Sequence, residues 1–156
     1  MLSPTEFIAD PDVVLLDLQA RSGDDVIRAL HARLAWATDA VTDPPRLLRE
    51  LLDRMHAGPV CLADELALPH ARTEAVSRLV LGVARVRDGV AFDAQHQHVR
   101  LIFLIGTPRE NVTEYLRVAA ALTRLLRAPA ARKALLAAKD ETEFRALLSA
   151  GAAAQR

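Results

Sequence analysis

The sequence has little cysteine, few aromatic residues and no long apolar run. Cys61 is its single cysteine, so no intrachain disulfide can form and a reducing compartment is expected. Aromatic residues make up only 4% of a chain that is 51% hydrophobic, so aliphatic side chains must supply most of the core. The longest run typical of a buried strand, residues 101–105, is far too short to cross a bilayer, and residues 1–10 lack the apolar stretch of a secretion signal. We therefore expect a cytoplasmic protein, peripheral to a membrane at most.

An excess of charge of one sign is also absent. Twenty Lys and Arg residues balance twenty Asp and Glu residues, and the formal net charge at pH 7 is zero. Eighteen of the basic residues are Arg, but they are interspersed with acidic residues along the chain rather than clustered. This balance argues against a nucleic-acid-binding surface and against a patch that binds anionic membranes.

Aliphatic runs that favour strands alternate with amphipathic stretches that favour helices. The compact runs predict strands at residues 13–16, 79–84 and 99–105. Capping residues, prolines and helical periodicity predict helices that begin after Ser22, after Asp43, after Asn111 or Thr113, and near residues 130 and 142. A turn at residues 87–89 is expected to join the last two strands.

This alternation predicts an α/β fold: a three-layer sandwich in which a mixed β-sheet is flanked by helices on both faces. A chain of 156 residues is long enough to bury a sizeable core as one domain, and the sequence contains no long linker or internal repeat. We expect a single domain over residues 1–156, with a core from about residue 5 to residue 149. The small and polar tail from Gly151 is expected to fray.

The most informative short motif is Leu-Ala-Leu-Pro-His at residues 66–70. Leu66 and Leu68 share one face of an extended segment. Pro69 cannot donate to a strand ladder, so pairing is expected to stop there and His70 to emerge at the sheet edge. A neutral imidazole at such a position is a nucleophile near physiological pH. Residues 107–110 are expected to form a strand-to-helix turn, and the alternative is that they also line the same end of the sheet as His70.

Residues 48–70 resemble the active-site region of the enzyme IIA domains of the phosphoenolpyruvate-dependent phosphotransferase system, in the fructose, mannitol and nitrogen-regulatory class. Leu-Leu-Asp-Arg at residues 51–54 and Ala-Leu-Pro-His at residues 67–70 stand at the spacing of that family. The central strands and late helices are similar as well, over residues 92–94, 99–105, 108, 116–126 and 129–138. The likeness covers roughly residues 5–149.

The resemblance implies that His70 accepts a phosphoryl group from a histidine phosphocarrier protein. His70 would then pass the group to a IIB domain, or hold it as a signal to a regulated kinase or transporter. The arginine of the family that assists this transfer matches Arg54, whose guanidinium can bind two phosphate oxygens. No metal ion and no organic cofactor is implied.

The chain departs from the family pattern at two places. Cys61, Ala63 and Glu65 occupy a loop in which the family usually has glycines, and Glu65 is a possible neighbour of the site. Tyr115 stands where many members carry a second active-site histidine, and its hydroxyl can still form a hydrogen bond to a phosphate or a ring nitrogen. These departures motivate an alternative function, that of a degenerate IIA-like regulatory module that binds partners without transferring phosphate.

Each candidate residue also has a purely structural interpretation. His70 can be an exposed histidine behind a strand-ending proline, Arg54 can favour the dipole of the helix end, and Tyr115 can be a core aromatic on an apolar stripe. His96 and His98 suggest a metal pair, and a metal-dependent hydrolase that uses them with His70 is a third hypothesis. Two histidines without a clear third ligand favour a polar hairpin instead.

Overall fold

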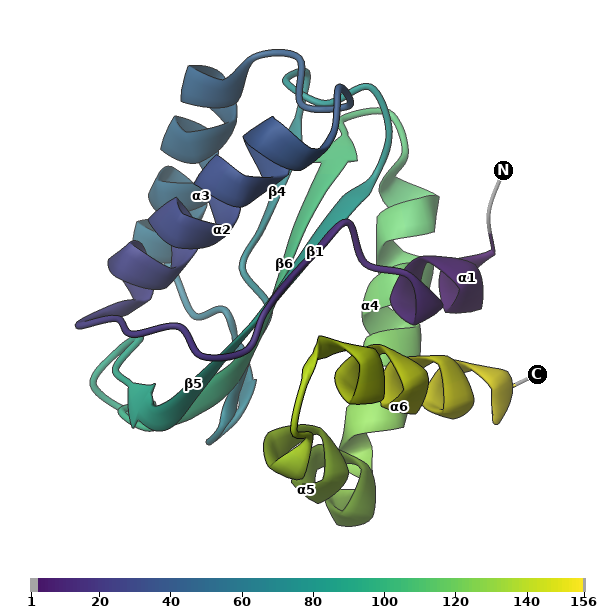
Figure 1. Cartoon of the computed structure of the whole chain (residues 1–156). Helices are drawn as coiled ribbons and strands as arrows, with labels where there is room; N and C mark the ends of the chain where they lie inside the picture. Colours follow the sequence, from purple (N-terminus) through teal and green to yellow (C-terminus); the bar gives the residue numbers. More distant parts are fainter. Residues whose placement is uncertain (1–2, 156) are drawn as a thin grey trace.

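The computed structural model describes residues 3–155 as a sheet between two layers of helices (Figure 1). Helices α2 and α3 cover one face, and α1, α4, α5 and α6 cover the other. The strands are β1 (Val13–Leu15), β2 (Cys61–Ala63), β3 (Leu66–Ala67), β4 (His70–Thr73), β5 (Val80–Val90) and β6 (Val99–Pro108). The helices are α1 (Pro4–Ala9), α2 (Gly23–Ala37), α3 (Pro44–Ala57), α4 (Val112–Arg127), α5 (Pro129–Ala137) and α6 (Glu141–Ala153). The predicted α/β three-layer sandwich is confirmed.

The sheet is mixed, as expected. Its strand order is β1-β5-β6-β3-β2, and β4 pairs with β6 beyond β3. Strand β5 runs antiparallel to β6, whereas β1 pairs parallel with β5, and both β3 and β4 pair parallel with β6. The long central pair β5–β6 therefore forms the centre of the sheet, and the shorter strands β1, β3 and β4 pair along its two outer edges.

Alternation along β5 and β6 divides the interior into two cores. Leu81, Val83, Phe103 and Ile105 pack on the side of α1, α4 and α6. Their neighbours along the strands pack against α2 and α3, and these include Val80, Ala84, Ile102 and Leu104. Successive side chains of a strand point to opposite faces, so two strands that are apolar at nearly every position require helices on both sides.

The helix starts that the capping signals predict are confirmed. The side chain of Ser22 accepts a hydrogen bond from the backbone N–H of Asp25, and that of Asp43 accepts one from Arg46. Asp140 caps α6 in the same way through Glu143. Asn111 occupies the N-cap position of α4 without such a bond. The side chains of Ser22, Asp43 and Asp140 satisfy N–H groups that the first helical turn leaves without partners.

The predicted turn at residues 87–89 is wrong. Strand β5 continues to Val90, with a register irregularity against β6 between Arg85 and Val90. Gly89 absorbs this irregularity at a φ of 77°, a conformation that glycine adopts without strain. The chain reverses further on, where Asp93 and His96 form an isolated bridge. Sequence patterns mark Asp-Gly as a turn, but here the pair lies within a bulged strand.

The tail is also more ordered than expected. Helix α6 continues to Ala153, and Ala152 is fully buried in the same core as Phe144 and Leu148. A Cβ atom on Gly151 would lie 2.8 Å from a methyl group of Leu125, so α6 approaches α4 closely at that point. The small residues near the end of the chain therefore allow close helix packing. The same small size had suggested that this segment frays. Residue 156 lies outside the described residues.

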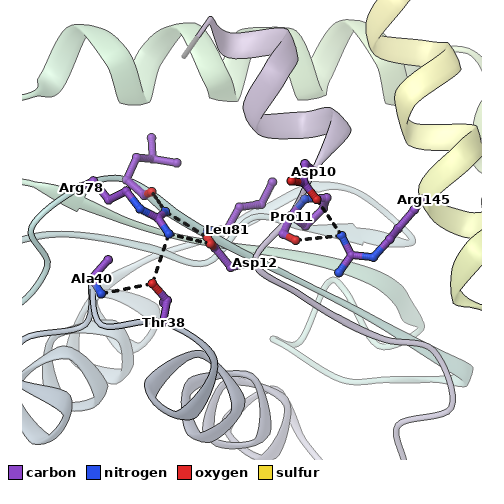
Figure 2. Close-up of polar contacts among 9 residues, drawn as sticks. Asp10, Pro11, Asp12, Thr38, Ala40, Arg78, Leu81 and Arg145 are labelled. Carbon is purple, nitrogen blue, oxygen red and sulfur yellow. Dashed lines mark hydrogen bonds and ion pairs between the residues drawn. The ribbon is translucent and has the colours of Figure 1, made fainter. Parts of the chain in front are cut away.

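A polar network fixes the segment between α1 and β1 (Figure 2). Asp12 accepts hydrogen bonds from Arg78 at 2.9 Å and from the backbone N–H of Leu81 at 2.9 Å. The guanidinium of Arg78 also donates to Thr38 at the end of α2, and Arg145 of α6 donates to the carbonyl of Pro11. One short segment thus connects the sheet to helices of both outer layers.

No helix within residues 3–155 is long and apolar enough to cross a membrane.

Candidate functional site

His70 is the first residue of β4. Leu66 and Ala67 of β3 pair with Leu101 and Ile102 of β6, and His70 then pairs with Ile105. The offset between partners is 35 residues in both strands, so β3 and β4 form one line along β6 that is interrupted only at residues 68–69. The expectation that pairing ends at Pro69 is therefore wrong: proline removes one donor, and its carbonyl still accepts a hydrogen bond from Ile105. His70 nevertheless lies at a sheet edge, because β4 pairs only with β6 among the described strands.

The ring of His70 is held in one tautomer. Its Nδ1 lies 3.0 Å from the carbonyl oxygen of Leu68. A carbonyl can only accept, so Nδ1 carries the proton and Nε2 keeps its lone pair. Burial lowers the pKa of His70; the hydrogen bond to Leu68 opposes this, and the charges of Arg54 and Arg72 lower the pKa further. The lowered pKa favours the neutral imidazole at pH 7, with the free lone pair on Nε2.

Arg54 lies in the last turn of α3, and its side chain reaches past the C-terminal end of that helix. The guanidinium donates to the carbonyls of Gly58 and Pro59 at 3.4 and 3.5 Å. These long bonds hold the group loosely near the residues that lead into β2, so a phosphate can compete for its donors. Arg54 also contributes to the helix-end interaction that the structural interpretation invoked.

Arg54 and His70 line one cavity of about 320 Å³, together with Glu50, Ala71, Arg72 and Arg109. Arg109 directly follows β6 and lines the same cavity as His70. The turn predicted at residues 107–110 is shorter than expected, because Thr107 and Pro108 are the last residues of β6 and pair with β4. Arg72 and Glu50 were not anticipated. The spacing held a signal for Arg72, because residues i and i+2 of a strand point to the same face. Glu50 lies one helical turn before Arg54, which places both on the same side of α3.

Glu50 offsets only part of the positive charge of this cavity. Its carboxylate receives a hydrogen bond of 2.7 Å from Arg46. Burial acts to raise the pKa of Glu50, but hydrogen bonds from Arg46 and Thr73 and the charges of Arg46 and Arg109 lower it overall. Glu50 is therefore ionised and already paired with Arg46. Three guanidinium groups, those of Arg54, Arg72 and Arg109, remain to face an anion.

Tyr115 packs against His70 from the first turns of α4. The ring centroids lie 4.9 Å apart and the rings are tilted by 32°. Burial raises the pKa of Tyr115, and the charges of Arg54 and Arg72 oppose that shift. The hydroxyl is therefore protonated and can donate a hydrogen bond. Tyr115 also borders the core that contains Val118, so the aromatic has both a packing role and a place beside His70.

Glu65 lies elsewhere. Its backbone carbonyl accepts hydrogen bonds from Arg100 and Leu101, and its carboxylate lies 3.7 Å from the guanidinium of Arg100. Five residues of extended chain, about 16 Å, separate Glu65 from His70. Glu65 is not among the residues that line the His70 cavity. Residues 61–67 form the antiparallel pair β2–β3, with no positive φ at any described non-glycine residue, so the missing glycines are not required for this backbone.

The histidines of the metal hypothesis do not converge within the described chain. His96 forms a group with Cys61 and Asp93, and neither His70 nor His98 belongs to any cluster of possible metal ligands among residues 3–155. The reversal at Asp93 and His96 agrees with the expected polar hairpin. A hydrolase centre made of His70, His96 and His98 is therefore contradicted.

Comparison with known proteins identifies the family. A model of the family described as "Phosphoenolpyruvate-dependent sugar phosphotransferase system, EIIA 2" matches residues 7–151. The chain belongs to this EIIA family. Among curated EIIA relatives, the fructose-specific EIIA component of Haloferax volcanii is 31% identical over 124 residues, which cover 78% of this chain and 80% of that protein. The 2-O-α-mannosyl-D-glycerate-specific EIIABC component of Escherichia coli is 30% identical over 74% of this chain but only 18% of its own length.

Solved structures of EIIA proteins have the same fold. The nitrogen regulatory protein IIA-Ntr of Neisseria meningitidis superimposes with a TM-score of 0.79 at 23% identity, covering 88% of this chain and 93% of that one. IIA mannitol of Escherichia coli has been solved in complex with phosphorylated enzyme IIB mannitol; that structure gives a TM-score of 0.75 at 22% identity over 90% of this chain and 96% of that one. Because their sequences are distant, these likenesses concern the EIIA fold alone.

Proposed function

We propose that this EIIA-family protein accepts a phosphoryl group on Nε2 of His70 from a histidine phosphocarrier protein. It then passes the group to a IIB partner or holds it as a regulatory signal. The observation that carries the proposal is the His70 ring, whose Nδ1 proton is bound to the Leu68 carbonyl at the wall of a cavity with three arginines. The family supports phosphotransfer in general; the acceptor, the donor and the partner are the proposed parts.

The transfer is a displacement at phosphorus. The Nε2 lone pair of His70 forms the new N–P bond, while the N–P bond to the donor histidine breaks and its electron pair returns to the donor ring. His70 keeps its Nδ1 proton, so its phosphorylated ring is cationic. The Leu68 carbonyl stabilises that cation because it already accepts this proton at 3.0 Å. No additional base is required.

The arginines neutralise the transferred group. Charge in phosphoryl transfer is spread over the equatorial oxygens, and catalysis consists mostly of positioning and electrostatic stabilisation. At an effective dielectric constant of about 20, one guanidinium about 4 Å from a phosphoryl charge contributes roughly 4 kcal/mol. Arg54, Arg72 and Arg109 line the cavity from the end of α3, from β4 and from the residue after β6. Convergence from three elements favours an anion site over a helix-end contact of Arg54 alone.

The donor and the acceptor must both reach His70 from outside. The cavity includes the edge strand β4 and is lined by polar side chains, so a partner can present a phosphohistidine or a nucleophile there. The IIA mannitol protein, which has the same fold, assembles with phosphorylated IIB mannitol. A IIB protein is therefore the acceptor that we propose, and a regulated kinase or transporter is the target if the phosphorylated form acts as a signal.

The test is intact mass after incubation with phosphoenolpyruvate, enzyme I and the phosphocarrier protein. We expect one phosphoryl group per chain, stable in base and lost in acid, and none on His70→Ala. His98→Gln is the matched control, since His98 lies outside the cavity. An EIIA protein of known activity must become phosphorylated in the same mixture.

Two results would refute the proposal. Phosphorylation that persists in His70→Ala would assign the acceptor elsewhere. Failure of phosphorylation with both a heterologous and the cognate phosphocarrier, while the known EIIA protein reacts, would favour the binding module without transfer. Tyr115 beside His70 is the feature that motivates this second function. The module predicts that His70→Ala binds its partner as well as the wild type.

A further inference from the structure

We propose that Cys61, Asp93 and His96 form a binding site for one Zn²⁺ ion, separate from the His70 cavity. One possible ligand atom from each residue lies within 4.8 Å of the other two. The site combines a sulfur, an oxygen and an imidazole nitrogen, a set that favours zinc-class metals over Mg²⁺ or Ca²⁺. It shares no residue with the lining of the His70 cavity.

Two separate parts of the fold bring these ligands together. Cys61 begins β2, whose partner Ala67 connects it to β3. Asp93 and His96 belong to the reversal between β5 and β6. Asp93 also lines a hollow of about 370 Å³ with residues 58–60, which lead into β2, so the two parts face each other beside open space. All three ligands are half-buried, which allows a metal ion to enter from solvent.

The carboxylate of Asp93 is already oriented. Its Oδ1 accepts hydrogen bonds from the backbone N–H groups of Gln95 and His96, at 2.9 and 2.8 Å. The His96 Nδ1 lies 2.8 Å from Oδ1 and 3.0 Å from Oδ2. Oδ2 has no backbone donor, so it is the oxygen available to a metal. The metal would take the place of the proton that now lies between this carboxylate and His96.

The thiol is the third ligand. Burial and the negative charge of Asp93 raise the pKa of Cys61 to about 11, so the metal-free thiol is protonated at pH 7. A divalent cation reverses this electrostatic environment and binds the thiolate. Binding therefore releases the thiol proton to solvent.

The distances between the three ligand atoms suit a site that closes on a zinc ion. With bonds of about 2.0–2.3 Å, a tetrahedral zinc ion sets its ligand atoms about 3.3–3.7 Å apart. The three atoms here lie within 4.8 Å, so a small side-chain movement completes the contact. Solvent would occupy the fourth position. Among the described strands, β2 pairs with β3 alone. The ion would link β2 to the β5–β6 reversal and would thereby stabilise the segment that precedes His70.

The test uses tag-free, reduced protein and Co²⁺ as a spectroscopic probe, followed by Zn²⁺ competition. We expect one Co²⁺ per chain, a thiolate-to-cobalt charge-transfer band, tetrahedral visible bands, and displacement by Zn²⁺. Cys61→Ser should abolish the thiolate band. Asp93→Asn and His96→Gln should each weaken affinity more than about tenfold, since even outer-shell partners of a metal are worth about 10–100-fold. His98→Gln is the matched control and should bind as the wild type does.

Thermal unfolding gives a second measurement. Zn²⁺ should raise the melting temperature of the wild type and of His98→Gln, and leave Cys61→Ser unchanged. The proposal is overturned if no thiolate band forms, or if the band and the affinity are the same in Asp93→Asn and His96→Gln, because the cysteine would then bind alone. Phosphorylation of His70 is measured separately, and neither result depends on the other.

Discussion

Arg85 offers the sharpest test of how helix α5 is attached to the sheet. It is fully buried in β5, where its guanidinium donates to four backbone carbonyls at 2.8–3.3 Å. One carbonyl belongs to Leu16 after β1, and the others belong to the end of α5, at Leu135, Leu136 and Ala138. The last carbonyls of a helix generally lack intrahelical partners, and of these three only Leu135 also accepts a backbone N–H within the described chain, from Ala138 at 3.4 Å. One arginine therefore completes the end of α5 and binds it to the sheet.

We predict that Arg85→Met destabilises the protein by about 3–5 kcal/mol. Methionine keeps much of the volume but donates nothing, and each buried carbonyl left without a donor costs roughly 1–3 kcal/mol. Relief of the buried charge offsets part of this sum, and removal of one partner from a buried charged contact typically costs about 3–5 kcal/mol. For a chain of this size, each kcal/mol lowers the melting temperature by about 2–4 °C.

Urea unfolding followed by circular dichroism measures this loss. The midpoint of unfolding should shift, while the dependence of the unfolding free energy on urea concentration stays the same. Arg87→Met is the matched control, since Arg87 lies two residues further along β5, is 57% exposed, and pairs with Asp17 at the surface. We expect that control to change stability by less than about 0.5 kcal/mol. If Arg85→Met lost less than about 1 kcal/mol, the carbonyl contacts would not stabilise the fold and the reasoning would be refuted.

Further predictions concern the core and the site. Leu104→Ala should cost about 2–5 kcal/mol in the same titration because Leu104 is fully buried, whereas a loss below about 1 kcal/mol would contradict its core position. Arg109→Ala and Arg72→Ala should each slow phosphorylation of His70 at least about tenfold without loss of fold; unchanged rates would remove them from the site. Phosphorylation should hold at neutral pH and decline only below the ordinary pKa of 6.5, because the folded pKa of His70 is lowered and Nε2 stays unprotonated. Below about pH 6.5 the unfolded chain binds the proton of this histidine more readily than the folded chain does, so the free energy of unfolding should fall as pH drops. A fall in phosphorylation or in stability that begins above pH 7 would contradict these expectations.

Local patterns were sufficient where neighbouring residues decide the outcome. Ser22 and Asp43 cap helices through hydrogen bonds within one turn, and the aliphatic runs around Val83 and Phe103 favour buried strands covered on both faces. The motif at residues 66–70 likewise indicated an extended segment that brings His70 to a sheet edge. Caps and the alternation of apolar residues are set by residues close in the chain, so sequence patterns report them directly.

Tertiary structure alone decided what distant segments do to one another. Pro69 interrupts pairing without ending it, because β6 continues alongside and holds His70 in the same register as Leu66. Gly151 does not mark a frayed tail, because the nearby Leu125 side chain on α4 requires a small residue there. The site follows the same division: the sequence by itself predicted His70 and Arg54 as site residues. The convergence of Arg72 and Arg109 on one cavity and the tautomer of His70 arise only when the strands pair. A charged cavity and an oriented ring are set by distances between residues far apart in the chain, and such distances exist only in the folded protein.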